Sequence, residues 1–209
     1  MKRTSLHRGI AVAILLGATA LGMAPPSNAA MSNKSLVSVL TGEPMAYDTD
    51  GSDYDILTAA VQAVLTAKPD SAVAVLADGS VPLTAFLPND RAFSNLVTAL
   101  TGSRPATEEA TFNAVAGLGI DTVEQILLYH VVPGKALTSS AALKANGAIL
   151  KTALPGKVIN VAVTKAPSII LGDYSTALRD PRVILRKVDI NKGSVQVAHG
   201  INAVLLPTG

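Results

Sequence analysis

The apolar pattern of this chain changes its period near residue 147, and this change constrains the fold more than any other feature. Before it, apolar residues recur every three to four positions, as on the buried face of a helix. After it, they alternate with polar residues, as in strands with one buried face. Helices followed by strands, with no repeat and no internal linker, indicate one α+β domain with an antiparallel sheet at its core.

Helical spacing occurs in four segments before residue 147, and two short strand patterns lie between the first two. Side chains that commonly cap helices precede these two helices, namely Asp53 or Asp55 and then Asn89 or Asp90. The expected helices are 53–70, 89–102, 106–119 and 121–133, and the expected strands are 72–80 and 81–90.

The second part of the chain carries five strand patterns. Pro-Gly, Ala-Pro, Asp-Pro and Asn-Lys-Gly sequences separate them and are typical of turns. The expected strands are 148–154, 157–164, 168–173, 182–190 and 194–207.

The N-terminus has the layout of a secretory signal peptide. Three basic residues precede a short apolar stretch, and small residues near Ala29 and Ala30 suit cleavage. A retained membrane anchor is the alternative, but the apolar stretch is shorter than the ~20 residues of a spanning helix. We therefore expect a signal peptide at 1–29, an N-terminal arm at 30–52 and a single domain at 53–209, in a secreted or envelope-associated protein.

Composition limits the classes of partner. Without the three basic residues of the signal peptide, 17 Lys and Arg become 14, against 15 Asp and Glu, so the mature chain has a net charge of −1. A basic surface for nucleic acid is therefore not indicated. The chain has no cysteine and hence no disulfide, and it has no tryptophan, so its core must be mainly aliphatic.

The chain lacks the sequence signatures of common hydrolases and metalloproteases. It contains no G-x-S-x-G, no H-E-x-x-H and no cysteine nucleophile. Two histidines remain after the signal peptide, His130 and His199, and two histidines without a nearby third ligand make a poor metal site. We therefore predict no catalysis, no cofactor and no metal.

The acidic stretch DTDGSDYD is the one candidate for a cation site. Asp48 and Asp50 match the first and third ligand positions of a calcium loop. However, Gly51 comes two places early, and Ala59 stands where a bidentate glutamate is required. A solvated arm with a helix cap is the preferred interpretation, and a weak cation site that includes Asp53 is the alternative.

A Tyr-His pair ends the helix expected at 121–133. His130 lies on the apolar face of this helix and Tyr129 at its edge, while Asp121 and Glu124 have the spacing of a capping box at its start. His199 has the parity of the apolar positions in its strand, so both histidines are expected to face the core. A buried neutral imidazole donates from one nitrogen and accepts at the other, and can join two otherwise unpaired backbone groups. We predict this structural role for both.

Three stretches together resemble the fasciclin domain, an extracellular adhesion module. They are LTAFLPNDRAF at 83–93, LLYHVVPG at 127–134 and VQVAHGINAVLLP at 195–207, and the resemblance covers roughly residues 53–207. The signature positions, mainly structural in role, are Thr84, Phe86, Pro88, Asp90, Phe93, Tyr129, His130 and His199.

The resemblance implies a β-sandwich wedge with several helices packed on it, and a role in binding without catalysis. Gly200 stands where the family usually has valine, and Asn202 where it often has aspartate. An Asp-Ile pair that some members use for integrin contact has its counterpart in Asp189 and Ile190, one residue further from the histidine of the third stretch than usual.

The expected function is that of a secreted adhesion or binding module whose partner is an extracellular or cell-surface protein or glycan. No nucleic acid is expected as partner, and a membrane only through an uncleaved signal peptide. The candidate contact surface is Asp189, Ile190 and Asn191, because an isoleucine beside a turn is more readily exposed than one inside a strand; the alternative is that Ile190 packs under the sheet.

Two other functions stay open at this point. A carrier or sensor of a small apolar ligand would contain a deep aliphatic pocket of several hundred Å³. An atypical hydrolase would need His130 or His199 exposed beside a serine or a carboxylate.

Overall fold

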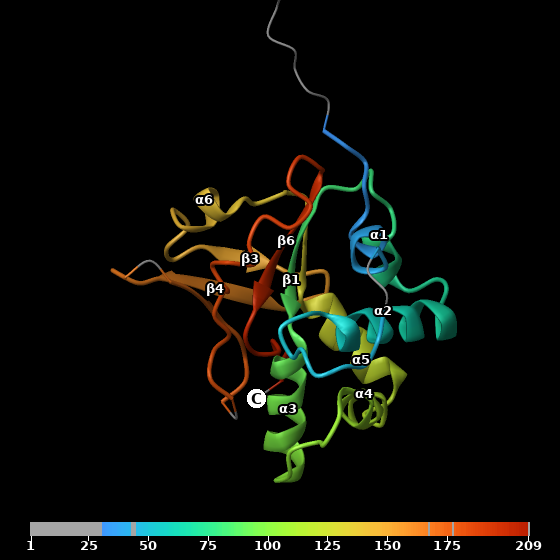
Figure 1. Ribbon diagram of the computed structural model, residues 1–209. Coiled ribbons are helices and arrows are strands. Elements are labelled where there is room, and N and C mark those ends of the chain that lie inside the picture. The colour runs from blue at the N-terminus through green and yellow to red at the C-terminus, as the bar shows by residue number, and fades with distance from the viewer. Residues whose placement is uncertain (1–30, 43–44, 167, 177, 209) are drawn as a thin grey trace, which may run out of the picture. The chain divides into compact units, whose positions relative to one another are not determined.

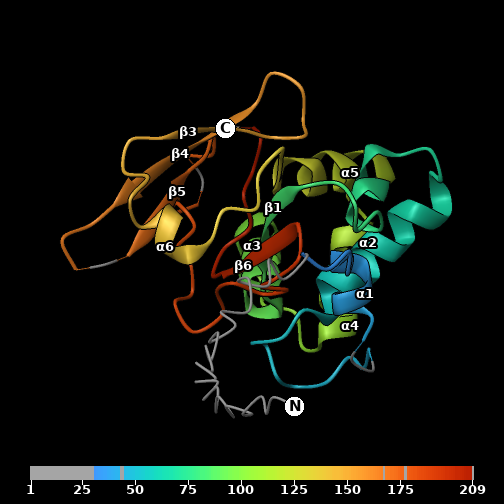
Figure 2. The same cartoon turned by 90° about the horizontal axis from the view of Figure 1, so that it is seen from above.

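Two three-stranded sheets and six α-helices make up the part of the chain that this computed structural model describes, residues 31–42, 45–166, 168–176 and 178–208. Helices and sheets both contribute, so the predicted α+β class is confirmed. Helices α1 (Leu36–Leu40), α2 (Asp55–Ala67), α4 (Glu108–Ala116) and α5 (Ile120–Tyr129) lie on one side of one sheet, and the other sheet lies on its opposite side (Figures 1 and 2). The predicted signal peptide lies outside the described residues.

The first sheet has the strand order β2-β1-β6 and is deeply buried. Strand β1 (Leu83–Pro88) pairs antiparallel with β2 (Val131–Pro133) and parallel with β6 (Gln196–Ile201). Every residue of β1 and β6 is buried, as in sheets that are covered on both faces. The prediction of an antiparallel core is therefore wrong for the central β1–β6 pair.

The second sheet has the order β3-β4-β5 and is antiparallel throughout. It consists of β3 (Ile149–Lys151), β4 (Val158–Val163) and β5 (Ile169–Gly172). Buried and accessible residues alternate along β4 and β5, because one face packs on the core and the other meets solvent. The three strands predicted here from the period-two pattern are confirmed.

An apolar cluster joins the two sheets. Phe86 of β1 and Ile201 of β6 pack together with Ile159, Leu171 and other buried residues of the second sheet. This packing of two sheets across an apolar layer is the sandwich that the family resemblance implies. A second cluster joins the other face of the first sheet to the helices.

The four predicted helices are present, and the structure adds three short helical segments. Figure 1 shows three of the predicted helices grouped on one side of the molecule, while the helix that follows β1 lies below the end of that strand. The helices are α1 (Leu36–Leu40), α2 (Asp55–Ala67), the 3₁₀ segment η1 (Ala72–Leu76), α3 (Asp90–Thr101), α4 (Glu108–Ala116), α5 (Ile120–Tyr129) and α6 (Ser139–Ala142). Among the described residues, no helix has the length and apolarity needed to cross a membrane.

Two predicted strands are not strands. The segment 72–80 begins with η1, because a 3₁₀ turn buries Val73 and Leu76, three residues apart, on one side. The segment 182–190 forms isolated bridges to neighbouring strands, and positive φ angles of 54° at Asp189 and 65° at Asn191 interrupt extended backbone at its end.

The expected capping box of α5 is also absent. Helix α5 has Gly119 as its N-cap and no side-chain cap. Asp121 and Glu124 instead bind Lys68, which follows α2. These ion pairs attach α5 to the end of α2, so the two carboxylates make a tertiary contact rather than a local one.

Part of the segment expected as an arm packs on the domain. Leu36 in α1 is fully buried, and its backbone N–H donates to the side chain of Gln196 in β6 at 2.8 Å. Asn89 caps α3 as predicted, accepting the N–H of Ala92 at 3.0 Å.

Candidate functional site

The structure brings the signature residues together around strand β1. Thr84, Phe86 and Pro88 lie on β1, and His199 of β6 is the direct neighbour of Phe86 in the sheet. The carbonyl of His130 accepts the N–H of Phe86 at 2.9 Å, which places the end of α5 beside the same strand. Asp90 and Phe93 follow in the first turn of α3, and both are buried.

His130 joins α5 to the C-terminal segment. The residue is 4% exposed, and its side chain faces inward as the helical spacing predicts. Nδ1 donates to the Ile126 carbonyl at 2.7 Å, and Nε2 accepts the N–H of Leu205 at 3.0 Å. Burial lowers the pKa of His130 to about 4, so the imidazole is neutral near pH 7.

His199 makes the same kind of bridge with its two nitrogens exchanged. Nε2 donates to the Leu137 carbonyl at 2.8 Å, while Nδ1 accepts the N–H of Asp189 at 3.3 Å. Burial lowers the pKa of His199 as well, against the effect of these neighbours. Each histidine thus pairs one backbone donor and one backbone acceptor, as the sequence analysis expects of a buried neutral imidazole.

The hydroxyl groups of the signature residues also bind backbone. The Tyr129 hydroxyl donates to the Val158 carbonyl at 2.8 Å, which links α5 to the second sheet. Burial raises the pKa of Tyr129, so the hydroxyl stays a donor. Thr84 Oγ1 donates to the Lys135 carbonyl at 2.7 Å and accepts the N–H of Leu137 at 2.8 Å. Both contacts hold the segment that follows β2.

Asp90 caps a helix other than its own. Its two carboxylate oxygens accept the N–H groups of Asp55 and Ile56, each at 3.0 Å, and so pair two free donors at the start of α2. Asp90 is 1% exposed. The expectation that Asp53 or Asp55 caps α2 is therefore wrong, since the cap comes from the first turn of α3.

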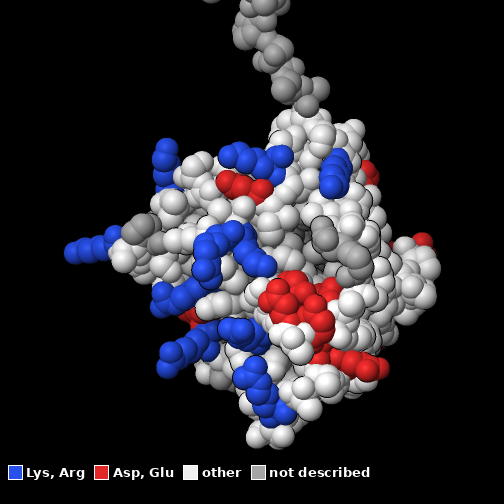
Figure 3. All heavy atoms as spheres, in the orientation of Figure 1, with Lys and Arg blue, Asp and Glu red and all other residues white. Residues whose placement is uncertain are grey.

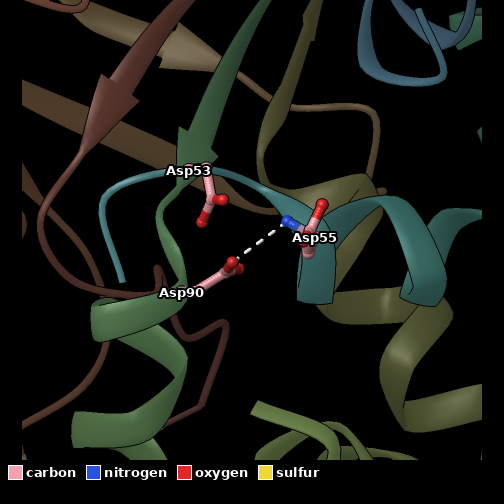
Figure 4. Close-up of side chains that lie close together, drawn as sticks. All are labelled: Asp53, Asp55 and Asp90. Atoms are coloured by element: carbon pink, nitrogen blue, oxygen red, sulfur yellow. Dashed lines mark hydrogen bonds between the residues drawn. The ribbon is translucent and has the colours of Figure 1, made fainter. Parts of the chain in front are cut away.

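Asp53, Asp55 and Asp90 form an acidic cluster at this junction. Each offers an oxygen within 4.8 Å of the others, and Asp53 and Asp90 point toward each other (Figure 4). Asp53 Oδ1 is buried and has no hydrogen-bond partner among the described residues. Burial, and after it the neighbouring Asp53, raise the pKa of Asp90 well above its ordinary value.

The carboxylates of Asp48 and Asp50, which the sequence suggested as possible cation ligands, bind backbone groups of their own loop. Asp48 accepts the N–H of Asp50 at 2.6 Å, and Asp50 accepts the N–H of Ser52 at 3.1 Å, so both carboxylates serve their own loop. In the cluster around Asp90, both oxygens of Asp90 accept N–H groups of α2, and Asp55 accepts the N–H of Ala46. The cluster therefore acts as a helix junction.

The candidate contact residues are half-buried and bound within the fold. The carboxylate of Asp189 accepts the N–H of Ser139 at 2.6 Å and its hydroxyl at 2.8 Å. The side chain of Asn191 donates to the Lys34 carbonyl at 2.7 Å. Ile190 packs partly against the helical core. The loop is thus held in one shape and leaves part of its surface accessible.

Gln196 is a structural residue that the sequence analysis missed. It is fully buried in β6, and its amide Nε2 donates to the carbonyls of Val75 and Asp78 at 2.8 and 2.7 Å. Its Oε1 binds Leu36, so one side chain connects β6, η1 and α1. A polar amide inside the apolar run of this strand is the signal that could have identified it.

Comparisons with known proteins give a family and a structural likeness. The sequence model described as "Fasciclin domain" matches residues 54–207. A solved structure described as a FAS1 domain pair from the insect cell adhesion molecule Fasciclin I is 17% identical, with a TM-score of 0.46, over 76% of this chain and 46% of that chain. This chain therefore spans less than half of that pair. No curated protein matches the sequence.

Proposed function

Because the chain belongs to the fasciclin domain family, we propose that it is a secreted, non-catalytic module that binds a protein or glycan on or outside the cell. Fasciclin domains are typical of adhesion modules that act outside cells or at their surface. The observation that carries the proposal is that the polar signature residues form hydrogen bonds to backbone groups inside the fold. What is left to meet a partner is the accessible loops and strand edges.

The two histidines give no support to the hydrolase alternative. That alternative requires an exposed imidazole beside a serine or a carboxylate, whereas His130 and His199 are 4% and 1% exposed. Both nitrogens of each ring are bound to backbone groups, so neither ring has a free nitrogen to take a proton from a nucleophile.

Charge segregation on the surface favours recognition of a charged partner. Figure 3 shows acidic side chains gathered in a patch beside a band of basic side chains on one face. Arg182 and Arg186 are exposed, and neither forms an ion pair within the described residues. Patches of opposite sign orient a partner and speed its association.

Asp189, Ile190 and Asn191 are the proposed contact. The bonds from Ser139 and to Lys34 hold this loop in place, so a partner would meet a shape that is already formed and loses little entropy on binding. Leu185, 49% exposed in the same segment, provides a matched apolar control outside the contact.

The test is retention of a partner from an envelope extract on immobilised protein, with excess soluble protein as competitor. We expect a partner whose retention is abolished by the soluble competitor. Its retention should fall with Ile190→Ser and stay unchanged with Leu185→Ser, when the two variants are compared at equal folded concentration by circular dichroism. No competed partner would refute the binding function. If both variants retain such a partner equally, the binding function stands but the contact lies on another surface.

A further inference from the structure

An open groove has a volume of about 410 Å³, in the range of small-molecule sites. It lies between α1, the start of α2 and the segment that leads to Ile190. Its walls are mostly apolar and include Val39, Leu40, Leu87, Val188 and Ile190. None of these apolar residues takes part in the histidine bridges, whereas Asp55, which also lines the groove, belongs to the acidic helix junction.

One wall of the groove is the ring of Tyr54, and Gly200 makes its position possible. A Cβ atom at residue 200 would come within 2.4 Å of the Tyr54 hydroxyl and 2.9 Å of Lys187 Cβ. The hydroxyl is buried without a hydrogen-bond partner among the described residues, which is unfavourable for folding and calls for an explanation. The valine usual in the family at this position would exclude the ring from this place.

The charged residues of the groove leave one cation free. Arg186 is exposed and has no hydrogen bond or ion pair within the described residues. Lys187 donates to the Ser52 carbonyl and lies over the Tyr54 ring, so its charge is partly engaged. Asp55, the acidic residue of the groove, accepts the N–H of Ala46 at 3.1 Å. The groove thus combines an apolar body with two cations and one acid.

We propose that this groove binds an aliphatic carboxylate, a molecule with an apolar chain and one anionic end. The chain would lie against Val39, Leu40 and Ile190, where burial removes apolar surface from water. The carboxylate would bind the guanidinium of Arg186, whose planar pair of donors matches its two oxygens. Ile190 belongs both to this groove and to the proposed adhesion contact, whereas Val39 and Arg186 belong to the groove alone, so the variants below are made at these two residues.

Decanoate is the probe, measured by isothermal titration calorimetry on the purified chain at low salt. We expect saturable binding near one site per chain. Arg186→Gln should weaken it about tenfold or more, since a hydrogen bond between charged groups has about that effect. Arg179→Gln removes an exposed arginine outside the groove and should leave the dissociation constant unchanged. Equal effects of the two substitutions would overturn the assignment of the anionic end.

Two further arms test the groove itself. Val39→Trp places a large ring in the groove from a half-exposed position, so the variant should melt like the wild type and lose decanoate binding. Wild-type affinity in a folded Val39→Trp protein would refute the groove as the site. Decyltrimethylammonium carries the same chain with the opposite charge and should bind at least tenfold more weakly. Equal binding of the two probes, or no saturable binding of decanoate, would also refute the proposal.

Discussion

The two sheets of this domain differ in whether their polar side chains are buried or exposed to solvent. In the β2-β1-β6 sheet, the central strands are buried throughout, and their polar side chains, such as Gln196 and His199, bind backbone groups of other elements. In the β3-β4-β5 sheet, burial alternates, and a polar residue such as Asn160 faces solvent. A polar group must find a partner in the first sheet but not in the second, since buried unpaired groups are costly.

This difference explains why the family signatures gather around the first sheet. Their polar residues connect elements that are far apart in sequence: His130 reaches Leu205, and Asp90 reaches the start of α2. Each contact pairs backbone groups that water cannot reach. We infer that the signatures describe how the buried sheet is held, and that binding uses other surfaces.

The largest expected effect is that of His130→Ala. The substitution leaves a cavity and unpairs two buried backbone groups, so we expect a loss of about 2–4 kcal/mol in the free energy of unfolding. Asn160→Ala, on the solvent side of the second sheet, should change it by less than about 0.5 kcal/mol. Urea denaturation of both variants measures these two losses of stability. Equal losses would contradict the claim that polar residues matter for stability in the first sheet but not in the second.

Asp90→Ala is expected to cost about 2 kcal/mol, at the upper end for a helix cap, because two N–H groups of α2 lose their acceptor. Asp121 also lies in the first turn of a helix, but it is exposed and binds only Lys68 among the described residues. Asp121→Ala should therefore leave the melting temperature nearly unchanged. A similar fall in melting temperature for both variants would show that the position in the helix, and not burial, determines the loss of stability.

The pH dependence of stability tests the neutral state of the histidines. Because the folded pKa of both lies below the ordinary value, the unfolded chain takes up protons first as pH falls below about 6.5. Each histidine should then remove about 1.4 kcal/mol of stability per pH unit, down toward pH 4 for His130. Asp90 acts in the opposite direction, since its raised pKa lowers stability as pH rises.

Comparison with His130→Gln isolates the histidine contribution. This variant should lose stability less steeply than the wild type between pH 7 and pH 5, measured by urea denaturation at each pH. The same slope in both proteins would mean that the pKa of His130 is the same in the folded and the unfolded chain, which would contradict a buried neutral ring.

Tyr129→Phe is the smallest change. It deletes the hydroxyl that binds the Val158 carbonyl and keeps the buried ring, so we expect a loss of about 1 kcal/mol. Thermal unfolding followed by circular dichroism is sufficient to detect it. A variant as stable as the wild type would show that the Val158 carbonyl finds another partner.

Periodicity in the sequence is enough to predict the three strands of the second sheet, the four main helices and the inward histidines. It works there because one face is buried and the other is not, as the alternation in β4 shows. It fails for the parallel pairing of β1 with β6, because strands buried on both faces carry no alternation that reveals their direction.

Local patterns also miss contacts that come from distant parts of the chain. The cap of α2 comes from Asp90, and Lys68 takes both acids of the expected capping box. The groove with Arg186 and Tyr54 depends on the missing side chain at Gly200, whose departure from the family is visible in the sequence but whose spatial consequence is not. Such contacts are set by tertiary packing, which a local residue pattern does not predict.

The central claim is that the signature residues hold the fold and do not touch the partner. The most direct test is partner binding by His130→Ala, measured per folded molecule at a temperature below its melting transition. The account predicts a lowered melting temperature together with wild-type binding by the folded fraction. A His130→Ala protein with wild-type melting behaviour and no partner binding would contradict it, and would make the Tyr-His pair part of the contact surface.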